Sequence, residues 1–285
     1  MHDSNDRWLL GRAATVTSQN GEDGIIEAAL DRLPTRDRWC VEFGAGDGVA
    51  LSNTWNLVQR HGYGAVLIEA DAQRFAALAG AHRGIPRVIR LQRRVGFDAD
   101  DSLDALLADT PVPRDFDLLS VDIDGNDYHV WDAVRDYRPK VVVIEFNPTV
   151  PIGVPFVQVR RHGVQHGASA ASLIQLASRK GYALVAATVV NAVFVDARYF
   201  SAFGIADNSE ATLRVDLSWV THIFSGYDGR VFLQGAQRLP WHELPLSAAR
   251  AQQLPWWLRA WPEDYGPARR LALRVYRRLR RRRWR

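Results

Sequence analysis

The glycine-rich segment at residues 39–48, WCVEFGAGDG, constrains the fold of this chain more than any other feature. Apolar side chains alternate along residues 39–43, and this pattern predicts a short buried strand. Glycines follow at positions 44, 46 and 48, and glycine lets a tight loop bring its backbone close to a ligand. A helical pattern over residues 52–60 completes a strand–loop–helix unit. The sequence therefore predicts an α/β domain that binds a nucleotide.

The spacing of the glycines separates two kinds of nucleotide site. A dinucleotide fingerprint, G-x-G-x-x-G, would place its third glycine at position 49, where this chain has Val49. The observed acidic–apolar–Gly–x–Gly–x–Gly pattern instead resembles motif I of the class I S-adenosylmethionine-dependent methyltransferases. The resemblance implies cofactor contacts from Glu42, Gly44, Ala45, Gly46 and Gly48. A nicotinamide-dependent oxidoreductase stays open as the alternative, although Val49 disfavours it.

Length and composition predict a globular, intracellular protein. A chain of 285 residues with 47% hydrophobic content can bury a large core, in one domain or one and a half. The single cysteine, Cys40, falls in the predicted first strand and has no intrachain disulfide partner, which suits a reducing compartment. There is no apolar N-terminal signal region and no apolar run of about 18 residues. We therefore expect a cytoplasmic protein.

The positive charge is concentrated at the C-terminal end. Net charge is +4, but ten of the 36 basic residues lie in residues 268–285, so the rest of the chain has 26 basic against 32 acidic residues. This distribution does not favour nucleic-acid binding. Leu271, Val275 and Leu279 recur every four residues among the arginines, which predicts a basic amphipathic helix over residues 267–285. Two interpretations of this helix remain open: peripheral contact with anionic lipids at the inner face of the membrane, or a solvated tail. The oligomeric state is not predicted.

Acidic residues follow the predicted second and third strands. An apolar run over residues 64–68 ends at Glu69, where a carboxylate can accept hydrogen bonds from both ribose hydroxyls, and Asp71 follows closely. After a third strand at residues 87–91, Asp98 is the candidate for the adenine amino group, with turn formation as the alternative. Upstream, the SQNGED segment at residues 18–23 either caps a helix or covers the cofactor pocket. The second interpretation makes Gln19 a cofactor contact.

The fourth and fifth predicted strands, at residues 116–121 and 141–144, end in further acidic residues. Because parallel strands present their carboxyl ends at one edge of the sheet, Asp122 and Glu145 are expected to share a crevice. Either carboxylate could act as general base, or Asp122, Asp124 and Glu145 could hold Mg²⁺. Expected substrate contacts are Asp127, Asn147 and His166. The alternative role of Asp127 is to cap a predicted helix over residues 128–137. The alternative role of His166 is that of a solvated loop residue.

The rest of the chain predicts three regions. Residues 1–200 carry the α/β pattern, which ends with a helix at 170–180 and strands at 183–190 and 192–195. Residues 201–266 are rich in tryptophan, contain a predicted hairpin around residues 227–229, and are expected to pack on the domain as an extension. Residues 267–285 form the arginine-rich tail.

Five sequence blocks together resemble the FkbM-like class I methyltransferases, in particular a bacterial subgroup with an SQ-x-GED start and an SIDIDGNDY motif. The blocks are SQNGEDGII, VEFGAGDG, VLIEAD, LLSVDIDGNDYHVW and PKVVVIEFNPTVP. The resemblance implies a mostly parallel seven-stranded sheet with its last strand antiparallel, S-adenosylmethionine as cofactor, and methylation of a hydroxyl on a sugar, glycan or secondary metabolite. The resemblance also implies that Glu69 is the acidic residue that binds the ribose and that Asp122 is the acidic residue at the end of the fourth strand. The rival hypothesis is an inactive scaffold of the same fold at the membrane.

Overall fold

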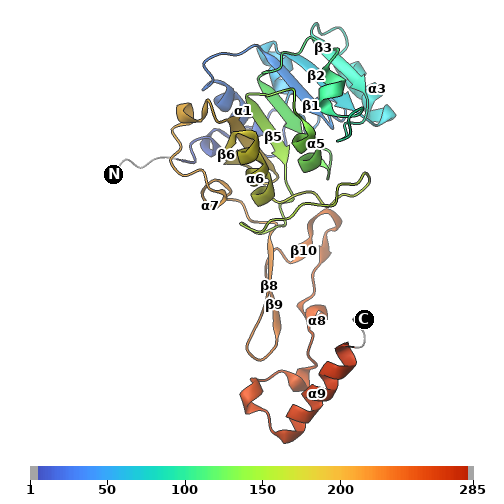
Figure 1. Ribbon diagram of the computed structural model, residues 1–285, viewed down its shortest axis with the longest axis vertical. Coiled ribbons are helices and arrows are strands. Elements are labelled where there is room, and N and C mark those ends of the chain that lie inside the picture. The colour runs from blue at the N-terminus through green and yellow to red at the C-terminus, as the bar shows by residue number, and fades with distance from the viewer. Residues whose placement is uncertain (1–5, 282–285) are drawn as a thin grey trace. The chain divides into compact units, whose positions relative to one another are not determined.

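The computed structural model describes residues 6–281 and divides the chain into two compact units, Met1–Leu217 and Ser218–Arg285 (Figure 1). The first unit contains the α/β sheet. The second contains two small antiparallel sheets and the C-terminal helix.

A seven-stranded sheet with the order β3-β2-β1-β4-β5-β7-β6 forms the centre of the first unit. Strands β1 to β5 pair in parallel, and β7 pairs antiparallel with both β5 and β6. The strands are β1 (Trp39–Phe43), β2 (Gly64–Glu69), β3 (Val88–Gln92), β4 (Leu118–Val121), β5 (Val141–Glu145), β6 (Tyr182–Ala187) and β7 (Asn191–Asp196). The Rossmann-like sheet with one antiparallel strand predicted from the sequence is confirmed.

Burial on both faces explains why these strands are almost continuously apolar. Val66 and Ile68 of β2 join a core on one face, while Ala65 and Leu67 join a second core on the other. The helical elements of this unit are η1 (Leu10–Arg12), α1 (Glu22–Leu30), α2 (Trp55–His61), α3 (Ala72–Ala81), α4 (Leu103–Leu107), α5 (Asp127–Ala133), α6 (Ala170–Lys180), η2 (Phe200–Phe203) and α7 (Glu210–Leu213). The parallel strands β1 to β5 all end at the same edge of the sheet, and a helix follows each of them in the chain.

The helix after the fourth strand is shorter than the sequence pattern predicts. The expected helix runs to residue 137, but α5 ends at Ala133 and Val134 is extended. The reason lies in a distant carboxylate: Asp104 accepts hydrogen bonds from the backbone N–H groups of Arg135 and Asp136, at 2.6 and 3.2 Å. These contacts satisfy the two groups outside the helix, so the chain turns into the next strand early.

The first unit continues past the seventh strand. Arg214, which follows α7, is fully buried and donates hydrogen bonds to the backbone oxygens of Val150 and Pro148 at 2.9 and 2.8 Å. Glu210 pairs with the same guanidinium at 3.0 Å. These contacts join residues 201–217 to the loop that follows β5.

The second unit contains the predicted hairpin. Strands β8 (Thr221–Ser225) and β9 (Val231–Gly235) are antiparallel around residues 226–230. The remaining elements are β10 (Arg238–Leu239), η3 (Pro240–His242), β11 (Leu244–Pro245), α8 (Ala248–Ala251), η4 (Trp256–Leu258), η5 (Pro262–Asp264) and α9 (Pro267–Arg281). The predicted tail helix is observed as α9, and residues 282–285 of that prediction lie outside the described residues. Within residues 6–281, no helix is both long and apolar enough to cross a membrane.

Candidate active site

The glycine loop after β1 has three glycines in the left-handed region, each in a different environment. A Cβ at Gly44 (φ +72°) would lie 1.6 Å from the backbone oxygen of Asp122, and one at Gly48 (φ +74°) would lie 2.8 Å from Nε2 of His82. A Cβ at Gly46 (φ +56°) would have no atom within 4 Å. The loop is therefore packed at both ends and open at its middle, so a ligand can approach the backbone there.

Glu42, in β1 just before this loop, is bonded to the segment that leads into α2. Its buried carboxylate accepts hydrogen bonds from Ser52 Oγ at 2.7 Å, from the backbone N–H of Asn53 at 2.8 Å and from Thr54 Oγ1 at 2.6 Å. Burial raises the pKa of Glu42, and these donors oppose the rise. The structure thus places Glu42 where it joins the end of β1 to the start of α2.

Glu69 is at the end of β2, next to the open part of the loop. Its carboxylate accepts from the backbone N–H of Gly46 at 2.9 Å and from that of Asp71 at 2.7 Å. A carboxylate offers about four lone-pair sites, so Glu69 keeps acceptor capacity for a ribose hydroxyl. Asp71 itself is exposed and caps α3 by accepting from the N–H groups of Gln73 and Arg74.

Asp122 and Glu145 lie together, as their positions at the ends of the adjacent strands β4 and β5 predict. Oxygen atoms of the two carboxyl groups lie within 4.8 Å of each other, so their ionised forms repel. Burial, followed by repulsion from neighbouring carboxylates, raises the pKa of Glu145 to about 10 and that of Asp122 to about 7. At neutral pH the pair is therefore partly protonated, and Asp122 ionises before Glu145.

Asp127 completes a group of three carboxylates whose oxygens lie within 4.8 Å of one another: Asp122, Asp127 and Glu145. Asp127 is buried, accepts from the N–H groups of Ile123 and Gly125 at 2.8 Å each, and has a pKa raised to about 6, mainly by burial. Hard divalent cations prefer such oxygen ligands. The sequence predicts Asp124 in this group, but Asp124 is exposed, has φ +55° and is not among the three.

The loop at residues 149–168 is attached to the strand-four motif by Gln158, whose role the sequence alone does not predict. Its buried amide donates to Asn126 Oδ1 and to the backbone oxygen of Val164, both at 2.9 Å, and accepts from the N–H groups of His166 and Gly167 at 2.8 and 2.9 Å. Every polar atom of this amide is thus bonded within the protein. The loop is held over the start of α5 by a side chain that contacts both segments.

The two predicted substrate residues beyond β5 belong to the same region. Asn147 accepts from the N–H and hydroxyl of Thr149 and donates to the backbone oxygen of His166 at 2.9 Å. The imidazole of His166 is exposed. The structure thus brings Asn147 and His166 together through the backbone.

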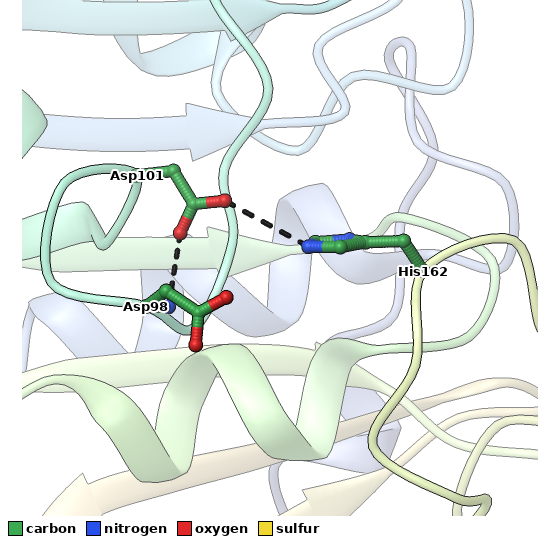
Figure 2. A group of neighbouring side chains, drawn as sticks. All are labelled: Asp98, Asp101 and His162. Carbon is green, nitrogen blue, oxygen red and sulfur yellow. Dashed lines mark hydrogen bonds and ion pairs between the residues drawn. The ribbon is translucent and has the colours of Figure 1, made fainter.

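A second contact attaches the same loop to the segment after β3, where Asp98 lies (Figure 2). The His162 ring stacks on Phe97 with centroids 4.6 Å apart, and the Arg160 guanidinium is 4.7 Å from the centre of the Phe97 ring. Arg160 forms an ion pair with Asp98 at 3.6 Å, and His162 Nε2 lies 3.8 Å from an oxygen of Asp101. Asp98, the predicted adenine contact, is exposed and is already paired with the Arg160 guanidinium.

The SQNGED segment has mainly a structural role in this geometry. Asp23 accepts hydrogen bonds from three consecutive backbone N–H groups at residues 16–18. Glu22 is fully buried and accepts from Thr188 Oγ1 at 2.6 Å and from Asn191 Nδ2 at 3.1 Å, at the turn between β6 and β7. Gln19 is exposed between these anchors.

Comparison with solved structures finds matches among methyltransferases at low identity. The CurJ carbon methyltransferase matches with TM-score 0.41 and 10% identity over 61% of this chain and 52% of that one. The N-terminal domain of EvdMO1 with SAH bound matches with TM-score 0.42 and 14% identity over 64% and 82%. The precorrin-6y C5,15-methyltransferase from Geobacter metallireducens matches with TM-score 0.38 and 15% identity over 64% and 92%.

This chain spans about half the length of the CurJ enzyme. No protein-family model matches the sequence, and no curated protein matches it significantly. The assignment of the fold rests on the strand order and the antiparallel β7 described above.

Proposed function

We propose that this chain is an S-adenosylmethionine-dependent O-methyltransferase that acts on a hydroxyl of a sugar, glycan or secondary metabolite. The observation that carries the proposal is the pair of partly buried carboxyl groups, Asp122 and Glu145, which lie together at adjacent strand ends beside the glycine loop and have raised pKa values. Transfer to a hydroxyl needs a group that takes the hydroxyl proton, whereas a site that only binds a nucleotide has no need of one. The sugar and glycan substrate class comes from the family resemblance of the sequence blocks.

The residues around the loop fit the proposed cofactor. Gly46 leaves its side of the loop open, and Glu69 next to it retains acceptor sites for ribose hydroxyls. When bound, the cofactor supplies an electrophilic methyl group. The glycine loop and Glu69 would hold it, and their role is to position its reactive end at the carboxyl edge of the sheet.

Asp122 is the residue we assign as general base. With a pKa of about 7, it is partly ionised near neutral pH and can accept a proton from a hydroxyl as the new O–C bond forms. The pKa of Glu145 is raised further, to about 10, so Glu145 stays protonated beside Asp122 when Asp122 is ionised. Asp127 accepts hydrogen bonds from the backbone N–H groups of Ile123 and Gly125 and so fixes the turn between β4 and α5.

A divalent cation is the alternative way to neutralise these carboxylates. Asp122, Asp127 and Glu145 would hold Mg²⁺, which would lower the pKa of the substrate hydroxyl. Turnover after treatment with EDTA distinguishes the general base from the cation. If a cation is required, turnover falls with EDTA and recovers with added Mg²⁺; if Asp122 acts alone, turnover does not change.

The test of the proposal is methyl transfer by the full chain from radiolabelled cofactor to a panel of glycan and sugar acceptors. Asp122→Asn removes the base with little change of volume and should lower kcat by 10²-fold or more. Asp109→Asn changes an exposed carboxylate in the same way and serves as the control. A near-normal rate in Asp122→Asn would reject the assignment of the base. Absence of both transfer and cofactor binding in the wild type would favour the inactive scaffold.

A further inference from the structure

The C-terminal helix α9 packs within its own unit through its polar side. Tyr276 donates a hydrogen bond to the backbone oxygen of Gln253 at 2.6 Å, and Arg280 Nε donates to the Tyr276 hydroxyl at 3.0 Å. Leu273, Tyr276, Arg277 and Arg280 line a cavity of about 420 Å³ together with residues of the 227–229 and 253–265 segments. The side of α9 that contacts the rest of the unit is therefore built mainly from tyrosine and arginine.

The apolar side of α9 faces solvent. Leu271, Val275 and Leu279 are 61%, 49% and 62% exposed. Residues four apart on a helix lie on one face, so these three form a continuous apolar row roughly opposite the positions that line the cavity. A helix of a globular protein normally turns such a row toward its core. In α9 the row is left for a partner outside the unit.

A row of arginines runs beside the apolar row. Arg270, Arg274 and Arg278 each precede one of the three apolar residues and are exposed. There is no aspartate or glutamate in residues 267–281. The face therefore requires a partner that is apolar in its interior and negatively charged at its surface, as a membrane with anionic lipids is.

Exposed tryptophans occur in the segment immediately before α9. Trp256 is 78% exposed, and Trp257 and Trp261 are 41% and 43% exposed. Tryptophan side chains favour the boundary between lipid headgroups and acyl chains, because the ring is apolar and its N–H is polar. Like the apolar face of α9, this segment therefore exposes apolar side chains that can insert at a membrane surface.

We propose that α9, together with these tryptophans, docks the second unit onto an anionic membrane surface, with the helix lying in the plane of the interface. A second copy of the chain fits the face less well, because pairing two such faces brings arginine rows against each other. A nucleic acid would leave the apolar row unsatisfied. This proposal does not depend on the proposed methyl transfer.

The test is flotation of the full chain with two kinds of vesicle, phosphatidylcholine alone and an equal mixture of phosphatidylcholine and phosphatidylglycerol. The apolar variant carries Leu271→Gln, Val275→Gln and Leu279→Gln, and the charge variant carries Arg270→Gln, Arg274→Gln and Arg278→Gln. Glutamine is a good helix former, so α9 should persist in both. Ile223→Gln, at an exposed apolar position of β8, is the matched control.

We expect the wild type and the control to bind the anionic vesicles, and each triple variant to lose about 100-fold in partitioning. The thermal unfolding midpoint and helical circular dichroism of the variants should equal those of the wild type. Failure of the wild type to bind anionic vesicles, or equal binding by the apolar variant, would overturn the proposal. Equal binding to neutral vesicles would overturn the anionic requirement. A wild-type dimer that becomes a monomer in the apolar variant, without vesicle binding, would assign the face to a second copy.

Discussion

Replacement of Gly44 by alanine should destabilise this protein far more than the same change at Gly46. Both glycines have positive φ, and an alanine in that region costs about 1 kcal/mol. At Gly46 that is the whole cost, because the new Cβ meets no atom within 4 Å. At Gly44 the Cβ would lie 1.6 Å from the Asp122 oxygen, well inside van der Waals contact, so the loop or the end of β4 has to move.

Overpacking that displaces backbone costs about 1 to 3 kcal/mol, so Gly44→Ala should lower the free energy of unfolding by about 2 to 4 kcal/mol in total. Gly62→Ala provides a control outside the loop, since Gly62 has φ +66° at the end of α2 and open space for a Cβ. Urea denaturation at pH 7 measures all three variants. A loss for Gly44→Ala no larger than the loss for Gly46→Ala would refute the packing of the loop against Asp122.

The same variants separate stability from ligand binding. Gly46→Ala should keep most of its stability but weaken S-adenosylmethionine binding, because the methyl group fills the open part of the loop. Gly62→Ala should lose similar stability and bind normally. Normal binding by Gly46→Ala would show that the cofactor does not approach the loop there.

Two further predictions concern particular carboxylate and amide contacts. Asp196 pairs with Arg138 and Arg198, which hold its pKa near 2, below the usual value of 3.8. Its contribution is therefore complete above about pH 4 and lost as pH falls toward 2, so Asp196→Asn should cost about 1 to 2 kcal/mol at pH 7 and much less near pH 2. Equal costs at both pH values in urea titrations would contradict this. Gln158→Ala should increase amide hydrogen exchange in residues 159–167 at least 10-fold, since it removes the bonds from this amide to Asn126 and to the N–H groups of His166 and Gly167. Unchanged exchange there would show that other contacts hold the loop.

The sequence predicts the position of the site better than its internal arrangement. Adjacent ends of parallel strands bring Asp122 and Glu145 together, and this follows from strand order alone. The choice between Asp124 and Asp127 does not follow, because it depends on the path of the short loop at residues 122–127, in which Asp124 has φ +55°. Both acids have the same chemistry and similar sequence positions.

Long-range contacts are the other part that the sequence does not reveal. Gln158 bonds to a motif about 30 residues earlier, and its own surroundings carry only loop signals. In α9 the periodicity predicts an amphipathic helix but does not say which face packs within the protein. Only the structure shows that tyrosine and arginine side chains of α9 contact the rest of the unit, whereas Leu271, Val275 and Leu279 are exposed.

The central claim is that the glycine loop and Glu69 form a site for S-adenosylmethionine. Calorimetric titration of the full chain with this cofactor tests it most directly, with Glu69→Ala as the site variant and Asp109→Asn as the control. We predict a dissociation constant in the micromolar range for the wild type and the control, and loss of binding in Glu69→Ala at an unchanged fold by circular dichroism. Absence of binding by the wild type, or undiminished binding by Glu69→Ala, would contradict the assignment of this site.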